Sequence, residues 1–248
     1  MGGPGGEETE LWPKPDSQCT LQDFPLVVYY PVGFWTAQGP VVCGGYNTNT
    51  NQWNRKCFIY KHRQWMPWTN MTTLRGHASA IQIGQNQALI IGGKDRLNTT
   101  ELVSSNGSEE GNEFPEIISR HCSFTINATH ALVTGGVQNG HWGDDTWYVD
   151  LTTQKFTPGP TMKTPRSSHG CSTVQLGNRS FGIVAGGQKS GGTTTTEYGL
   201  DWSETRHRNT GYLYTTEMID LDQESHEWFR GIQDQSKIVD LVLKSTFS

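Results

Sequence analysis

The chain has 248 residues, a formal net charge of -5, 17% charged residues and 29 glycines. A single all-β domain of this length is ordinary, and abundant glycine with few charges favours short strands and turns over helices. The negative balance gives no electrostatic reason to expect nucleic acid or an anionic membrane as a partner, and no apolar run approaches the roughly 18 residues that cross a bilayer.

The N-terminal residues 1–25 are interpreted as an extension that precedes the folded repeats. Residues 1–10 are glycine-rich and acidic, without the basic and then apolar order of a signal peptide. Gly6 stands where a myristoylation signal needs Ser or Thr. Either the protein is cytosolic or its true start is missing, and we favour the second. The segment 11–15, around Trp12, is a candidate for one stray strand.

Four glycine pairs divide the chain, and each closes a run of branched aliphatic residues. The pairs are Gly44 and Gly45, Gly92 and Gly93, Gly135 and Gly136, and Gly186 and Gly187. Their first members are 48, 43 and 51 residues apart. Such a period is typical of repeat architectures, in which one repeat is one supersecondary unit.

Each repeat contains four candidate strands. In the first repeat, 26–71, they are 26–34, 40–45, 56–62 and 64–68. In the second, 77–118, they are 77–83, 88–93, 99–104 and about 112–117. In the third, 121–162, they are 121–126, 131–136, 146–151 and 155–158. In the fourth, 169–231, they are 169–176, 181–187, 215–221 and 227–229. Because most connections are too short for a crossover helix, each repeat is expected to form an antiparallel meander.

Sheets of this kind are apolar on both faces, so a single one is not stable alone. Neighbouring repeats must stack face to face around an axis, and the architecture that does this is a β-propeller. The glycine pairs fit this prediction, because the end of a second strand must turn without a Cβ where neighbouring blades crowd together.

The residues around the glycine pairs resemble the kelch repeat. The resemblance rests on an aliphatic strand, a diglycine, a Tyr or other large residue, an aromatic, and then Met and Arg ahead of His. In the first repeat these are Tyr60, Trp65, Met71, Arg75 and His77; in the third, Tyr148, Phe156, Met162, Arg166 and His169. The fourth keeps only Ile219 and Trp228, and the second has Leu102 and Val103 where the aromatic usually stands. No Trp-Asp dipeptide or sialidase-type box supports a competing kind of propeller.

The resemblance implies an all-β, kelch-type β-propeller that is incomplete, because family members close with five to seven or more blades. Only four repeats are legible here, within residues 26–231. The C-terminal residues 232–248 contain an alternating segment, 237–243, that is a candidate first strand. An open ring leaves sheet edges exposed.

The eight histidines do not predict a metal site. His77, His121 and His169 recur with the repeat, which spreads them around a ring and favours structural roles. His141 lies near Asp144 and Asp145, and hydration in a surface loop is expected there. Some kelch-like propellers are copper oxidases, but their His, Tyr and Cys constellation does not map onto this chain. We therefore predict no catalytic residue, cofactor or metal.

The cysteines bear on the cellular compartment. Cys43 ends a second strand and Cys57 begins the third, so antiparallel pairing brings them within disulfide range. We predict a disulfide there, with two buried thiols as the alternative. Cys122 and Cys171 occupy similar first-strand positions in adjacent repeats, and we expect them to pack in the core as thiols. Cys19 is unassigned, since the five cysteines cannot all pair within the chain.

Five Asn-x-Ser/Thr sequons favour an extracellular or secreted protein over a cytosolic one. All five are expected in connections: Asn70 after a fourth strand, Asn98 between strands two and three, Asn106 between three and four, and Asn127 and Asn178 between one and two. The turn preference of Asn explains part of this placement.

A propeller without catalytic residues is most often a recognition scaffold, because rigid sheets hold variable loops in fixed positions. The connections between strands two and three lie at the same end of a meander as those between repeats, and they contain side chains typical of interfaces. The candidate binding residues are Tyr46, Trp53, Arg55, Arg96, His141, Trp142, Tyr198, Trp202, Arg206 and Arg208. The last four lie in the longest connection, which is either functional or disordered. For Trp53 and Trp142, packing against their own blade is the alternative.

We expect a non-enzymatic module that binds a protein or a glycan through this end of the sheets. Two alternatives remain open. One is a fragment of a kelch-like propeller enzyme, an oxidase or isomerase with key residues in missing blades. The other is an intracellular kelch adaptor. A cluster of His, Tyr or Cys at a central channel would favour the enzyme, and an aromatic and Arg patch on the loops would favour binding.

Overall fold

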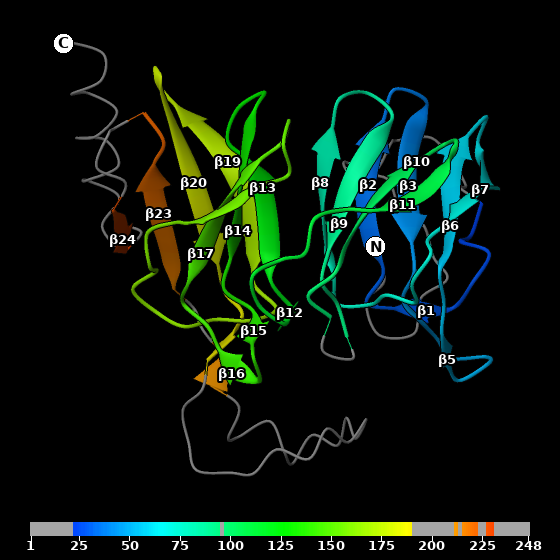
Figure 1. The fold of residues 1–248 in the computed structure, drawn as a ribbon, viewed down its shortest axis with the longest axis horizontal. Coiled ribbons are helices and arrows are strands. Elements are labelled where there is room, and N and C mark those ends of the chain that lie inside the picture. Colours follow the sequence, from blue (N-terminus) through cyan, green and yellow to red (C-terminus); the bar gives the residue numbers. More distant parts are fainter. Residues whose placement is uncertain (1–21, 95–96, 190–210, 213–214, 223–226, 231–248) are drawn as a thin grey trace, which may run out of the picture. The chain divides into compact units, whose positions relative to one another are not determined.

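The computed structural model describes residues 22–94, 97–189, 211–212, 215–222 and 227–230, and the regular structure of these residues is β throughout (Figure 1). The chain divides into two compact units, residues 1–119 and 120–248. The boundary falls between the second and third predicted repeats. Among the described residues, no helix has the length and apolar composition needed to cross a membrane.

Four antiparallel, four-stranded meanders form the two units. The first unit contains β2 (Val32–Thr36), β3 (Gly39–Cys43), β6 (Lys56–Lys61) and β7 (Gln64–Asn70), then β8 (Ser79–Ile83), β9 (Gln87–Ile91), β10 (Thr100–Ser104) and β11 (Gly107–Glu110). The second contains β13 (Cys122–Thr125), β14 (His130–Thr134), β17 (Thr146–Asp150) and β18 (Phe156–Pro158), then β19 (Gly170–Leu176), β20 (Arg179–Ala185), β23 (Thr216–Asp220) and β24 (Trp228–Arg230). The predicted all-β class and antiparallel meanders are confirmed.

The described residues also form eight shorter strands: β1 precedes the first of the longer strands, and the other seven lie in the connections between them. They are β1 (Val28–Tyr29), β4 (Tyr46–Asn47), β5 (Gln52–Trp53), β12 (Ile118–Ser119), β15 (Val137–Gln138), β16 (His141–Trp142), β21 (Gln188–Lys189) and β22 (Gly211–Tyr212).

All but two of the strands predicted within the four repeats have bounds within two residues of the observed ones. The predicted strand 26–34 is wrong, because Tyr30 has φ 57° and Pro31 follows it, so the chain breaks between β1 and β2. The predicted strand 112–117 is also wrong. A two-residue turn before Gly107, which has φ 132°, returns the chain at once as β11.

Two sheets stack in each unit, with the first strand of one sheet against the first strand of the next. In the first unit β2 lies against β8, around a core that includes Val41, Ile59 and Ile90. In the second unit β13 lies against β19, around Leu132, Val184 and Ile219. Continuous burial along the second strands explains their unbroken aliphatic runs. Among the described residues, no strand pairing closes the sheets into a ring.

The glycine pairs end the second strand of each sheet, as predicted. Both members of each pair have positive φ, from 54° to 127°. A Cβ on Gly44 would collide with the carbonyl oxygen of Arg75, and one on Gly92 or Gly135 would collide with the carbonyl oxygen of Ile118 or Arg166. Only glycine combines this backbone conformation with so close an approach.

Candidate binding surface

Short hairpins extend three of the sheets beyond the glycine pairs. They lie at the end of each sheet that holds the connection between its second and third strands, which we call the 2–3 end. β4 pairs with β5, β15 with β16, and β21 with β22. The segment that leads into a first strand lies at the same end, because β1 pairs with β4 and Ser167 bridges Gln188. The expectation that the two kinds of connection share one end is therefore correct.

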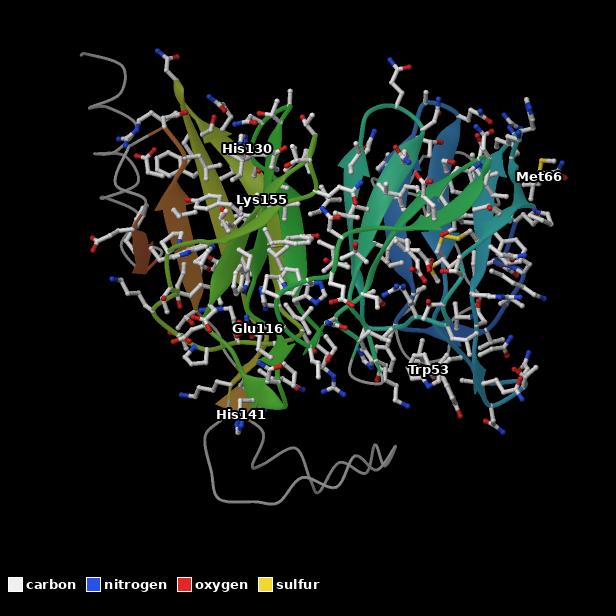
Figure 2. All side chains as sticks on the ribbon, viewed as in Figure 1. Trp53, Met66, Glu116, His130, His141 and Lys155 are labelled. Atoms are coloured by element: carbon white, nitrogen blue, oxygen red, sulfur yellow. A yellow bond between two sulfur atoms is a disulfide. The ribbon has the colours of Figure 1, made fainter. Side chains whose placement is uncertain are left out.

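Aromatic rings form a continuous row at the 2–3 end of the first unit. Tyr46 and Trp53 face each other across the β4–β5 hairpin with ring centroids 5.2 Å apart. Trp53 lies 6.0 Å from His77, and His77 stacks on Tyr30 at 3.8 Å and an interplanar angle of 27°. Tyr30 is 37% exposed, so the row reaches solvent. Figure 2 shows Trp53 at this end of its unit.

Trp53 also has a packing role, which was the alternative to binding. A Cβ on Gly76 would collide with its indole ring, so the ring lies directly on the connection that leads into β8. The Lys94 Nζ atom lies 4.6 Å from the ring centroid, within range of a cation–π interaction. Trp53 therefore joins its hairpin to the next repeat, rather than packing only on its own sheet, and remains half-buried.

Four bulky or polar residues adopt the left-handed conformation two positions before the first strand of each sheet. They are Tyr30, His77, Arg120 and Ser168, with φ between 52° and 58°. The His77 N–H donates to the Tyr30 carbonyl at 3.1 Å, and the Ser168 N–H donates to the Arg120 carbonyl at 2.8 Å. His77 is thus equivalent to Arg120 and not to His121, so the predicted recurrence of three histidines at one position is wrong.

The hairpin of the third sheet matches that of the first. Trp142 pairs with Val137 across β15 and β16, as Trp53 pairs with Tyr46, and it is also half-buried. His141 is exposed at the tip of the hairpin, at the opposite end of the second unit from His130 (Figure 2).

The remaining predicted binding residues contribute less to a described site. Arg55 is exposed, and its Nη1 donates to the Thr72 carbonyl at 3.5 Å. The other predicted residues, Arg96, Tyr198, Trp202, Arg206 and Arg208, lie outside the described residues, as do Cys19 and the two terminal candidate strands.

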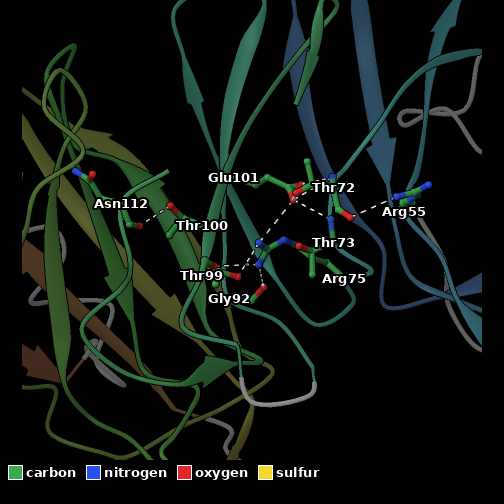
Figure 3. Close-up of polar contacts among 9 residues, drawn as sticks. All are labelled: Arg55, Thr72, Thr73, Arg75, Gly92, Thr99, Thr100, Glu101 and Asn112. Atoms are coloured by element: carbon green, nitrogen blue, oxygen red, sulfur yellow. Dashed lines mark hydrogen bonds and ion pairs between the residues drawn. The ribbon is translucent and has the colours of Figure 1, made fainter. Parts of the chain in front are cut away.

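A buried ion pair beside the glycine pair was not predicted. Arg75 leaves the connection after the first sheet, and its guanidinium donates to the carbonyls of Gly92 and Thr99 at 2.7 and 2.9 Å (Figure 3). Its Nη2 lies 3.8 Å from the Glu101 carboxylate, and both side chains are fully buried. Burial lowers the pKa of Arg75, and Glu101 opposes that shift. The carboxylate also accepts the backbone N–H groups of Thr72 and Thr73.

The second unit repeats this network. Arg166 donates to the carbonyls of Gly186 and Thr215, and its Nη2 lies 2.7 Å from Glu217. A sequence signal was available, because Glu101 and Glu217 each follow two threonines and begin an otherwise apolar stretch of a third strand. The third sheet lacks this ion pair. In the connection before it, Ile118 stands where the arginine would be, and in its third strand Trp147 stands where the glutamate would be.

Both cysteine pairs form disulfides. Cys43 and Cys57 lie opposite each other on β3 and β6 with Cα atoms 4.0 Å apart, as predicted. The expectation of free thiols at Cys122 and Cys171 is wrong. They form a disulfide with a Cα distance of 5.9 Å, because the stacking of β13 on β19 brings two first strands together.

Two buried histidines flank the disulfide between sheets. Burial lowers the pKa of His121 to about 3, with a further contribution from His169. Burial likewise lowers the pKa of His169 to about 3, with a contribution from Arg166. The Thr134 hydroxyl lies 2.9 Å from His169 Nε2 and 3.3 Å from the Cys122 carbonyl. Both rings are therefore neutral at physiological pH.

Four of the five sequon asparagines are exposed, and Asn98 is half-buried. Asn106, Asn127 and Asn178 lie in tight turns at the ends of the sheets opposite the 2–3 end. Asn70 is the last residue of β7 rather than part of the following connection. The Asn127 Oδ1 atom accepts the N–H groups of Thr129 and His130 at 2.9 Å.

Within the described part of the chain, no group of three His, Cys, Asp or Glu side chains could hold a metal ion. No protein-family model and no curated protein matches the chain.

Proposed function

We propose that this chain is a non-enzymatic binding module of the kelch type, which engages a protein or a glycan through the 2–3 end of its sheets. The observation that supports this most is the aromatic row from Tyr46 to Tyr30. Exposed aromatic side chains on rigid loops are the usual centres of binding energy.

The conformation of Tyr30 and His77 adds to this argument. A bulky residue with positive φ costs about 1–2 kcal/mol relative to glycine. Glycine holds the neighbouring positive-φ positions Gly44 and Gly45, and Asn51 holds the one at the tip of the β4–β5 hairpin. Arg120 and Ser168 share this conformation at the equivalent positions, so the repeat itself holds the backbone of Tyr30 and His77 in a fixed position for binding.

The repeated features support the kelch type and a propeller architecture. The glycine pair, the following Met71 or Met162, and the Arg that crosses to the next glycine pair have the same contacts in both units. A stack of such sheets continued by further repeats is how a propeller is built.

An extracellular location and N-glycosylation belong to the same proposal. Disulfides persist in oxidising compartments, and the described residues contain two. A glycan on Asn106 would project from the end of its sheet opposite the 2–3 end and leave the aromatic row of the same unit open.

The test is binding of a fluorescent oligomer of the chain to cell surfaces, compared across matched tryptophan variants. Trp53→Ala, combined with Tyr30→Ala, should abolish binding. Trp35→Ala is the control, because Trp35 is 65% exposed at the opposite end of the first sheet. Equal loss in the control, or retained binding in the double variant, would refute the proposed surface.

A further inference from the structure

The two disulfides differ in their access to solvent. Cys43 and Cys57 are 0% and 1% exposed, whereas Cys122 and Cys171 are both half-buried. Exchange with an external thiol requires a thiolate to reach one of the two sulfur atoms, so its rate depends on access. In the folded chain, a small thiol in solution therefore reaches the disulfide between sheets more readily than the one within a sheet.

The first strands that this disulfide joins are polar and open. None of the seven residues of β19 is buried, whereas Ser79 and Ile81 are buried in β8, the equivalent strand of the first unit. The Thr173 hydroxyl donates to the Thr125 carbonyl on β13 at 2.6 Å, which is a polar contact between the two strands. The disulfide and polar contacts therefore attach β19 to β13 more than burial of its own side chains does.

Two buried histidines oppose the packing beside the disulfide. His121 precedes Cys122, and His169 lies two residues before Cys171. Among the described residues, no group hydrogen-bonds to either ring nitrogen of His121 or to the Nδ1 atom of His169. A buried polar group without a partner costs free energy in the folded state. The equivalent of His169 in the first unit is Ala78, which packs on the apolar core. The covalent bond thus holds together a region in which the burial of two rings favours opening.

We propose that Cys122–Cys171 is a site of thiol exchange, at which a low-molecular-weight thiol opens the cross-link between the two sheets. A thiolate of the reagent attacks one cysteine sulfur, the S–S bond breaks, and the other cysteine leaves as a thiolate that takes up a proton. A second reagent thiolate then attacks the mixed disulfide and releases the first cysteine, which is protonated in turn. Two reagent thiols are thereby oxidised to one disulfide, and the cystine is reduced to two cysteine thiols.

The consequence of reduction is confined to the first strands of the second unit. β19 should separate from β13, while the apolar core that includes Leu132, Val184 and Ile219 keeps the rest of the two sheets stacked. The site goes beyond the proposed function and does not depend on it, because the aromatic row lies in the first unit.

The experiment exposes the folded whole chain to reduced glutathione, blocks free thiols with N-ethylmaleimide, and locates the blocked and glutathionylated cysteines by peptide mass spectrometry. We expect Cys122 and Cys171 to react at least about tenfold faster than Cys43 and Cys57, because the buried pair is attacked only after local unfolding. Hydrogen exchange of the same samples should become faster in peptides from β13 and β19 and stay unchanged in peptides from β2 and β8.

Two matched variants complete the test. Cys122→Ala with Cys171→Ala should show the faster exchange of β13 and β19 without glutathione and no further change with it. Cys43→Ala with Cys57→Ala should keep the full response to glutathione. Reduction of the two disulfides at equal rates would overturn the inference. So would reduction of Cys122–Cys171 only where the whole chain unfolds, or a reduced chain in which β19 exchanges no faster.

Discussion

The two units share one plan but are cross-linked differently. In the first unit Cys43–Cys57 joins neighbouring strands of one sheet, which the β-ladder already holds together. In the second unit Cys122–Cys171 joins two stacked sheets. The equivalent positions in the first unit are Val32 and Ala80, which lie in its apolar core. Sheet stacking can therefore be held by apolar packing alone, and the second unit adds a covalent bond to it.

The buried ion pairs, unlike the disulfides, occur at equivalent positions in both units. Arg75 with Glu101, and Arg166 with Glu217, each tie a connection to the next sheet. Ile118 and Trp147 replace both charges at the equivalent positions. Joint replacement is expected, since one buried charge without its partner is strongly destabilising.

The largest effect should follow from breaking one ion pair. Glu101→Leu leaves the buried Arg75 without its carboxylate and should lower the free energy of unfolding by about 3–5 kcal/mol. The double change Arg75→Ile with Glu101→Trp, which copies Ile118 and Trp147, should recover most of it. Hydrogen exchange of peptides from each unit measures both effects. A double variant no more stable than the single one would show that the charges are needed for stacking itself.

Removing each disulfide tests which of the two cross-links contributes more to stability. The chain-entropy relation predicts a loss of about 4 kcal/mol for Cys122→Ala with Cys171→Ala and about 3 kcal/mol for Cys43→Ala with Cys57→Ala, from loop separations of 49 and 14 residues. Denaturant unfolding of the two double variants gives the difference. A larger loss in the first unit would contradict the relation.

Acid should weaken the second unit more than the first. The pKa values of His121 and His169 are about 3 in the folded chain, below the ordinary 6.5, so the unfolded chain binds more protons between these values. Their stabilising contribution is complete above pH 6.5 and falls as the pH drops toward 3. From pH 7.5 to 5, each should cost about 2 kcal/mol.

Hydrogen exchange at the two pH values, corrected for the intrinsic exchange rate, measures this loss in each unit. A His121→Phe variant is the matched comparison and should lose about half of the dependence. Equal acid sensitivity of the two units would show that other groups dominate.

The smallest effect concerns the hairpin tryptophan of the first unit. Lys94→Gln removes the cation over Trp53 and should cost about 0.5–1 kcal/mol, as at other exposed cation–π sites. The change in thermal midpoint checks this value. A Lys94→Arg variant keeps the cation and should retain the thermal midpoint. A lowered midpoint in this variant would show that packing, and not the cation–π interaction, accounts for the lost stability.

Much of the fold follows from short-range pattern. The glycine pairs, the aliphatic runs before them and the register that places Cys43 opposite Cys57 all depend on residues in neighbouring strands of a meander. The two strand predictions that were wrong also failed for local reasons. The left-handed Tyr30 before Pro31 broke a strand, and the turn at Gly107 ended one early.

Some residues of the candidate site were likewise predicted from the sequence, and others were not. Tyr46, Trp53 and Trp142 were identified from their place between strands two and three, whereas Tyr30 and Lys94 were not. These two join the row only because the connection into β8 and the end of β9 pack on the first hairpin.

The sequence by itself determined the all-β class, the four repeats and the disulfide within a sheet. Only the tertiary structure decided the ion pairs, the disulfide between sheets, the burial of His121 and His169 and the aromatic row. The physical reason is distance along the chain. Strand pairing in a meander joins near neighbours, but stacking brings together residues such as Arg166 and Glu217, which are 51 positions apart. A local pattern can mark the glutamate, but only the stacking identifies the arginine that it pairs with.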